Sequence, residues 1–240
     1  MKNKKDVIYL SVGLFITGTL LLVLLLPNTY FKLGNIFFGD VPALYNLNLA
    51  QRFYIMAAYP MVGKAPLFAH YQLSRTYFIQ GNLLGALDEA LNELILYPEN
   101  DRTYYIIGLT YGYMNREHEA IGAFTKFIKK NPSSWAARND KAWLQFRVGD
   151  ITGGLETIEP VSTLVNPWVQ NTYGTLLMNA GRPKEAEQAF LRASEIIGKY
   201  SNESWGNAYP GNDPRIYDNG LASMQQSITS NLQLLQASVE

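Results

Sequence analysis

The sequence predicts an all-α protein, an α-solenoid of about four helix pairs that follows one N-terminal transmembrane helix and ends in a C-terminal capping helix. Three observations predict it. An uninterrupted apolar run stands near the start, a pattern of aromatic, glycine and alanine positions returns about every 34 residues behind it, and the last apolar residues recur at three- and four-residue steps. A period of this size is typical of solenoids, whose units bury their apolar faces against one another.

Composition narrows the class of protein further. The 240 residues are 48% hydrophobic and 17% charged, which excludes a long disordered chain. Lys plus Arg equal Asp plus Glu at 20 each, so the overall charge gives no reason to expect a nucleic-acid partner. The chain has no cysteine, which excludes disulfides, Cys-ligated metals and cysteine nucleophiles.

The apolar run covers residues 7–26, which are 20 consecutive uncharged residues. At 1.5 Å of rise per residue such a helix spans about 30 Å, the thickness of the hydrocarbon core of a bilayer. Pro27 ends the run. Behind it stand aromatic residues of the kind found at membrane interfaces: Tyr30, Phe31, Phe37 and Phe38. We therefore expect contact with the lipid bilayer through residues 7–26.

A cleaved signal peptide is the alternative interpretation of this run. Signal peptides have shorter apolar regions and end at an Ala-x-Ala-like site, which is missing here, so we favour a retained anchor within residues 1–32. Lys2, Lys4 and Lys5 precede the run, and only Lys32 follows it closely. The positive-inside rule then predicts a single-pass protein with a cytoplasmic N-terminus and an extracytoplasmic solenoid, periplasmic in a bacterium.

The repeat is clearest between Pro98 and Pro132, which are 34 residues apart. The unit there carries Tyr104, Ile107, Gly108, Tyr111, Asn115, Ala120, Phe124, Phe127 and Pro132. The unit before it carries Leu73, Ser74, Tyr77, Gly81, Ala86, Ala90 and Pro98, and the last full unit Tyr173, Gly174, Leu177, Gly181, Ala186, Phe190 and Ala193. Small residues at shared offsets let paired helices approach closely, and the aromatic residues fill the gap to the next unit.

This pattern resembles the tetratricopeptide repeat family over residues 66–199, and residues 180–190 match its turn and second helix closely. The third unit departs from the pattern. Lys141 and Gln145 stand where the family has apolar residues, Gly154 replaces an alanine, and Pro160 falls inside the expected second helix. Asn100, Ser133 and Asn166 are expected to cap the helices that follow them.

Two flanking segments complete the predicted organisation. Residues 33–65 are expected to form a connecting helix or degenerate repeat. Residues 43–59 have helical spacing and are expected to be the second helix of that degenerate repeat. Residues 200–240 begin as a loop with an embedded Trp205 and continue as a one-faced helix suited to covering the last repeat.

Nothing in the sequence points to catalysis, so we expect no enzyme, cofactor or metal site. The two histidines, His70 and His118, stand in different repeats, and we interpret both as surface or half-buried residues. No glycine-rich phosphate-binding motif occurs.

The resemblance implies that the first helix of each unit lines a concave groove. On the family register the groove-facing residues are Phe68, Tyr71, Arg75, Phe78, Arg102, Tyr105, Leu109, Tyr113, Asn139, Trp143, Phe146, Trp168, Asn171, Thr175 and Met178. From these the predicted partner-binding residues are Tyr71, Arg75, Tyr105, Leu109, Asn139, Trp143, Asn171 and Thr175. Aromatic rings with Arg and Asn suit an extended peptide, although some of them could instead pack internally.

The predicted function is therefore a membrane-anchored scaffold that binds a protein or peptide partner, as an assembly or secretion factor of the cell envelope. The alternative is a structural protein whose copies associate into oligomers through the anchor and the C-terminal helix. Gly13 and Thr17 form a small-xxx-small pair that can bring two anchors together.

Overall fold

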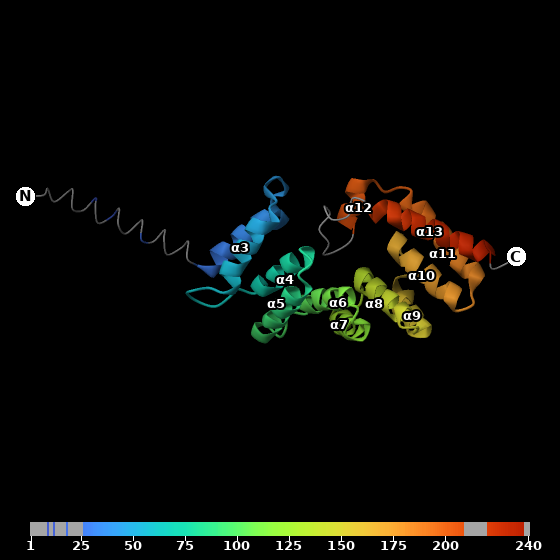
Figure 1. Ribbon diagram of the computed structural model, residues 1–240, viewed down its shortest axis with the longest axis horizontal. Coiled ribbons are helices and arrows are strands. Elements are labelled where there is room, and N and C mark those ends of the chain that lie inside the picture. The colour runs from blue at the N-terminus through green and yellow to red at the C-terminus, as the bar shows by residue number, and fades with distance from the viewer. Residues whose placement is uncertain (1–8, 10–11, 13–17, 19–25, 209–219, 238–240) are drawn as a thin grey trace, which may run out of the picture. The chain divides into compact units, whose positions relative to one another are not determined.

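The computed structural model describes residues 9, 12, 18, 26–208 and 220–237. The chain divides into two compact units, Met1–Asn100 and Asp101–Glu240. Every regular element in the described ranges is a helix or a short helical turn, as the sequence predicts (Figure 1). The division falls at Asn100, inside the segment 66–199 that was expected to form one solenoid, and each unit is described by itself.

The predicted membrane anchor lies almost wholly outside the described residues, because only positions 9, 12, 18 and 26 of the run belong to them. Within the part of the chain that the structure describes, no helix combines the length and the apolar character needed to cross a membrane.

The described residues of unit 1 form two helix pairs. Its elements are α2 (Pro27–Asn35), the short turns η1 (Ile36–Asp40) and η2 (Pro42–Leu44), α3 (Leu47–Ala58), α4 (Ala69–Ile79) and α5 (Leu83–Leu96). Helices α2 and α3 pack together, α3 packs on α4, and α4 packs on α5. Helix α2 is thus the first helix of the degenerate pair, of which the sequence indicated only the second.

The aromatic residues expected at a membrane interface pack against α3 instead. Phe31 and Phe38 contact the fully buried ring of Tyr54, with centroids 6.0 and 5.9 Å away. The other two rings, at positions 30 and 37, stack on Phe53. The reason is the close approach of the two helices, since Gly34 of α2 lies so near the Tyr54 ring that a Cβ atom would have no room.

Unit 2 contains three helix pairs and two C-terminal helices. The pairs are α6 (Arg102–Tyr113) with α7 (Glu117–Lys130), α8 (Trp135–Arg147) with α9 (Ile151–Ile158), and α10 (Pro167–Asn179) with α11 (Pro183–Ile197). The turn η3 (Glu159–Val161) follows α9, and α12 (Asn202–Ala208) and α13 (Gly220–Ala237) end the described chain.

The small residues of the repeat allow the paired helices to approach closely, as their spacing predicts. A Cβ atom on Gly108 would lie 2.9 Å from the ring of Phe124, and one on Gly174 would lie 2.7 Å from the ring of Phe190. Both rings are buried between the two helices of their pair. The same glycine–phenylalanine contact in two repeats fixes the distance between paired helices.

The structure of the α8–α9 pair explains why its sequence departs from the repeat pattern. Helix α9 ends at Ile158, so Pro160 follows the helix within η3 and does not interrupt it, contrary to expectation. Gln145 is buried but satisfied, because its Nε2 donates to Asp150 at 2.9 Å and its Oε1 accepts from Thr157 at 2.7 Å. A polar residue can therefore replace an apolar one at this position.

One of the three predicted helix caps is confirmed. The side chain of Asn166 accepts from the backbone N–H of Val169 and caps α10. Ser134, rather than its neighbour at position 133, caps α8. Asn100 instead donates from Nδ2 to Glu93 at 2.8 Å, because a buried carboxylate lies within its reach.

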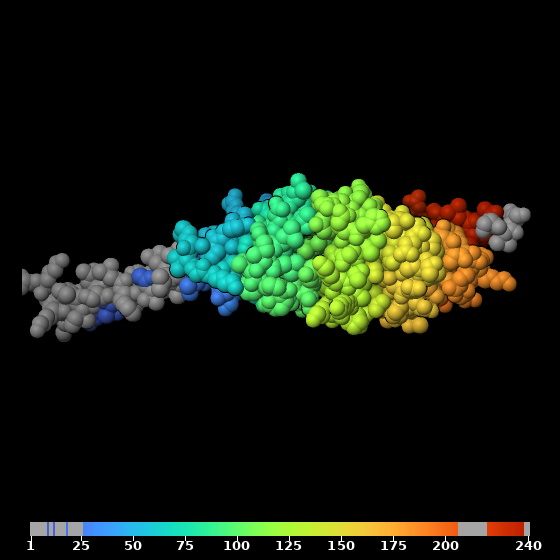
Figure 2. Space-filling view, turned by 90° about the horizontal axis from the view of Figure 1, so that it is seen from below, coloured from blue at the N-terminus to red at the C-terminus, as the bar shows by residue number. Residues whose placement is uncertain are grey.

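Helix α13 packs along α11 and buries Leu221, Ile228 and Leu235. Figure 2 shows it in red, lying along the orange surface at the C-terminal end of unit 2. The apolar residues of α13 lie on one face of the helix, which suits this position. A terminal repeat exposes an apolar face, and an amphipathic helix can cover it while its polar face meets solvent.

Candidate functional site

A cavity of about 440 Å³ opens in unit 2. The first helices of the three pairs contribute Leu109, Tyr113, Asn139, Asp140, Trp143, Trp168, Asn171 and Thr172. The C-terminal part of the chain contributes Trp205, Gly220, Ser223, Met224 and Ser227. Because α6, α8 and α10 all supply residues, the cavity lies on the face that first helices present in a two-helix solenoid.

The structure brings four of the predicted partner-binding residues to this cavity. They are Leu109 of α6, Asn139 and Trp143 of α8, and Asn171 of α10. Leu109 and Asn171 stand 62 positions apart in sequence, and the stacking of helix pairs places all four residues on one surface.

Two aromatic side chains give the cavity its exposed apolar area. Trp143 is 41% exposed and Tyr113 is 61% exposed, although both are large rings. Trp143 rests on Phe146 with ring centroids 5.2 Å apart, which fixes its orientation. A second hollow of about 400 Å³ shares Leu109, Tyr113, Asp140 and Trp143 with the first. The two rings are therefore accessible from both hollows.

Tyr105 and Thr175, also predicted to bind a partner, are buried instead. The ring of Tyr105 packs against Phe124 and Phe127, with centroids 5.6 and 5.3 Å away, and its hydroxyl donates to Asp140 at 3.1 Å. The hydroxyl of Thr175 donates back to the carbonyl of its own helix at position 171. Both side chains are buried, and neither lines the cavity.

Tyr71 and Arg75 belong to unit 1 and serve its packing. The guanidinium of Arg75 lies 4.7 Å from the ring centroid of Phe38, and its Nη1 donates to Gln72 at 2.9 Å. The backbone N–H of Tyr71 donates to Glu93 at 3.2 Å. These contacts tie α4 to the turn η1 and to α5.

The C-terminal part of the chain supplies one wall of the cavity, which the sequence did not indicate. Trp205 stacks on Trp168 with ring centroids 4.0 Å apart and planes inclined by 21°. Trp135 and Tyr200 extend this cluster. An isolated tryptophan within a polar loop was the available signal, because such a residue needs an apolar surface to pack on.

Asp140 and Thr172 were also missed, since each directly follows a predicted groove residue and no pattern distinguishes it. Among the described residues that line the larger cavity, Asp140 alone carries a charged side chain. The lining is thus aromatic and amide-rich with one carboxylate, a chemistry suited to binding rather than to acid–base catalysis.

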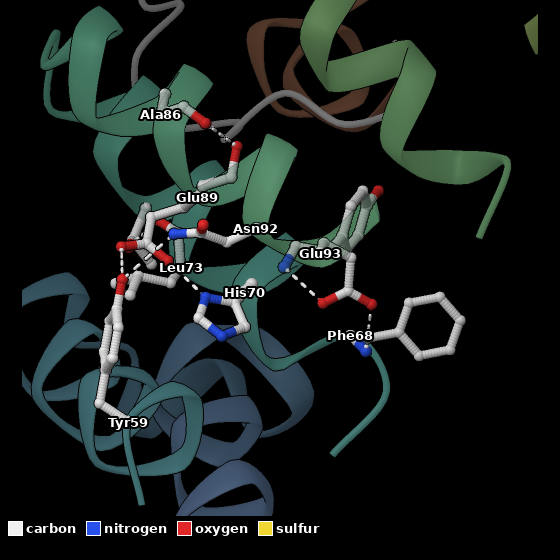
Figure 3. Close-up of polar contacts among 11 residues, drawn as sticks. Tyr59, Phe68, His70, Leu73, Ala86, Glu89, Asn92 and Glu93 are labelled. Atoms are coloured by element: carbon white, nitrogen blue, oxygen red, sulfur yellow. Dashed lines mark hydrogen bonds and ion pairs between the residues drawn. The ribbon is translucent and has the colours of Figure 1, made fainter. Parts of the chain in front are cut away.

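Unit 1 contains a buried polar cluster that the sequence did not indicate (Figure 3). His70 is buried, which corrects the expectation of a surface or half-buried residue, and its Nδ1 lies 2.6 Å from Glu89. Tyr59 donates its hydroxyl to the same carboxylate at 2.7 Å. Partial burial and this hydrogen bond raise the pKa of Tyr59 to about 12, because both disfavour the phenolate.

One turn further along α5, the fully buried Glu93 caps α4 from a distance. Its carboxylate accepts from the backbone N–H groups of Phe68 and Tyr71 at 2.8 and 3.2 Å, and from the amide of Asn100 (Figure 3). The cluster satisfies the first turn of α4 and is structural. Within the described ranges, no three His, Cys, Asp or Glu side chains come together as a metal site would require.

Comparison with known proteins agrees with this architecture. Residues 101–134, which span α6 and α7, match the family model described as tetratricopeptide repeat. A search of curated proteins gave no significant match. A solved structure of AMB-1 MamA is similar over 73% of this chain and 93% of that one, with 18% identity and a TM-score of 0.59.

The structure of YrrB, described as a TPR protein with an unusual peptide-binding site, is similar over 71% of this chain and 86% of its own. Its identity is 16% and its TM-score 0.58. Identities this low carry information on the fold alone. The chain therefore has the fold of tetratricopeptide-repeat proteins, and its residues 101–134 match the model of one repeat.

Proposed function

We propose that this protein is a membrane-anchored scaffold that binds an extended segment of a partner protein in the cavity of unit 2. The observation that carries the proposal is the presence of Trp143 and Tyr113 as exposed rings at a cavity of about 440 Å³. Large rings held by neighbouring packing supply contact area at little entropic cost, which is how binding surfaces use them.

The amide side chains favour a peptide over a small apolar ligand. Asn139 and Asn171 line the cavity on neighbouring first helices, and an amide can both donate to and accept from an extended backbone. YrrB shares the fold and is described as having a peptide-binding site, which supports the same use here by analogy.

The charge of the lining restricts the partner further. Asp140 supplies a carboxylate, and no Lys or Arg stands among the described residues of the larger cavity. A segment that is neutral or basic fits this surface, because a basic side chain can pair with the carboxylate of Asp140.

The membrane part of the proposal rests on the sequence. Residues 7–26 are long and apolar enough to span a bilayer, and the lysines before them favour a cytoplasmic N-terminus. The repeats would then stand outside the cytoplasm, where a scaffold can serve assembly or secretion at the cell envelope. Protease added to spheroplasts, whose outer membrane is opened, should digest the repeats. Protection in spheroplasts, followed by digestion once detergent opens the inner membrane, would refute this orientation.

Site-specific photo-crosslinking tests the binding site. A photoreactive residue at Trp143 in the full-length chain should crosslink one partner segment, which mass spectrometry identifies. The matched control is Leu191 on α11, which is exposed but does not line the cavity. Equal crosslinking from both positions, or none from position 143, would contradict the assignment of the cavity.

Self-association through the C-terminal helix is less well supported. Helix α13 buries Leu221, Ile228 and Leu235 within its own chain. Among its outward Gln, Ser and Thr residues, Leu234 alone of the described residues of this helix is a large apolar side chain that stays exposed, so little apolar surface remains for a second copy. The mass of the detergent-solubilised protein should therefore not increase with concentration through this helix.

A further inference from the structure

The loop between α3 and α4 presents two neighbouring apolar side chains to solvent. Within this loop, residues 60–65, Met61 is 87% exposed and Val62 is 59% exposed. Single exposed apolar residues are common, but two at the tip of a short loop indicate a surface that is covered in use.

The frame of this loop is fixed rather than loose. Ala65 is buried, and its carbonyl accepts a hydrogen bond from the hydroxyl of Tyr97 at 2.5 Å. The ammonium of Lys64 lies 4.4 Å from the centroid of the same ring. Pro60 precedes the tip and restricts its backbone further. Met61 and Val62 are therefore held outward by the structure.

The position of the loop identifies what covers it. A Cβ atom on Gly63 would lie 3.8 Å from the Cγ of Pro27, so the loop sits beside the first residue of α2. Pro27 directly follows the apolar run 7–26, the predicted membrane span. In Figure 1 the cyan loop protrudes at the end of unit 1 where α2, in blue, begins. A chain that leaves a bilayer at Leu26 places this loop at the bilayer surface.

We infer that the 60–65 loop inserts Met61 and Val62 into the interfacial region of a phospholipid bilayer, next to the point where the chain leaves it. Lys64, at the edge of the same loop, faces the phosphate groups of the lipids. The inference rests on the proposed membrane anchor and adds a second contact to it. Two contacts fix the orientation of unit 1 on the membrane, whereas one span would leave it free to rotate.

The absence of cysteine makes the test direct, because one introduced thiol can be labelled alone. The full-length variant Met61→Cys, labelled with an environment-sensitive fluorophore, is reconstituted into vesicles of phosphatidylcholine and phosphatidylglycerol. The matched control is Leu84→Cys, which is also exposed but lies at the far end of α5, about 20 Å along that helix from Tyr97.

At position 61 the label should shift to shorter emission wavelengths, and nitroxide-bearing lipids should quench it several-fold more than the label at position 84. Iodide in the water should quench the two labels in the opposite order. A chain that floats with the vesicles while both labels respond alike overturns the loop contact and leaves the anchor intact. A chain that does not float with the vesicles refutes the anchor itself, and the loop contact with it.

Discussion

Asn231 of α13 donates a hydrogen bond of 3.0 Å from Nδ2 to Oδ1 of Asn171 on α10, although the two residues are 60 positions apart. This bond connects the C-terminal helix to the first helix of the last pair, in addition to its packing on α11. The C-terminal helix also lines the cavity of unit 2 through Gly220, Ser223, Met224 and Ser227, so changes in it should affect both stability and the proposed binding of a partner.

Two adjacent leucines test whether α13 is a structural cover. Leu235 is 5% exposed and Leu234 is 59% exposed. Leu235→Ala should lower the free energy of unfolding by about 2–4 kcal/mol, because it removes buried methyl groups and leaves a cavity. Leu234→Ala should change it by about 0.5 kcal/mol or less. Urea denaturation of the full-length protein in detergent measures both, and equal effects would contradict the packing of this helix.

Trp143 tests the binding cavity. Trp143→Ala should weaken the binding of the crosslinked partner segment by about 2 kcal/mol, roughly 30-fold, because a central aromatic anchor is lost. The circular dichroism spectrum should stay unchanged, since the ring is partly exposed. Leu191→Ala is the control and should bind as the wild type does. Retained affinity in Trp143→Ala would exclude the cavity as the binding site.

Two glycines test the close approach of paired helices. Gly174→Ala should destabilise the protein by about 1–3 kcal/mol, because the new methyl group would meet the Phe190 ring. Gly122 in α7 has open space around it, so Gly122→Ala should be neutral or stabilise by up to about 1 kcal/mol through helix propensity. Thermal unfolding compares the two, and the same sign for both would show that the contact does not limit the helix spacing.

Glu93 tests the buried cap of α4. Glu93→Ala should cost about 2–4 kcal/mol, because the backbone N–H of Phe68 and the amide of Asn100 lose a buried acceptor. Hydrogen exchange should rise first at the start of α4. Glu99→Ala removes an exposed carboxylate nearby and should leave both measurements close to the wild type.

Tyr59 gives unit 1 a defined alkaline sensitivity. Its pKa of about 12 in the folded chain exceeds its ordinary value of 10.0. Below pH 10 the phenol is protonated in both states, and between pH 10 and 12 only the unfolded state releases the proton, so the folded state loses stability there.

The variant Tyr59→Phe has no phenol proton to release, so it cannot lose folding stability in this way between pH 10 and 12. It should be about 1 kcal/mol less stable than the wild type at neutral pH, because the hydrogen bond with Glu89 is missing. The difference should shrink as the pH rises from 10 to 12, which urea denaturation at several pH values measures. A constant difference across this range would contradict the raised pKa.

Much of the site could be predicted because it follows the repeat. Leu109, Asn139, Trp143 and Asn171 all line the cavity, and the register of the first helices was enough to select them. Tyr105 was misplaced for a physical reason. It stands four residues before Leu109 on the same face of α6, but its ring is buried against Phe124 and Phe127 of α7, and the spacing within one helix does not encode that packing.

The sequence by itself determined that the chain folds into helix pairs and that an apolar run of membrane-spanning length precedes them. Both are properties of local spacing, namely the recurrence of small and aromatic residues and the uninterrupted length of the run. Only the tertiary structure decided that Trp205 and Met224 form a wall of the cavity, that Glu93 of α5 caps the start of α4, and that Gly63 lies beside the first residue of α2. These relationships join residues far apart in the chain, and no local pattern encodes a contact that exists only after the helices have packed.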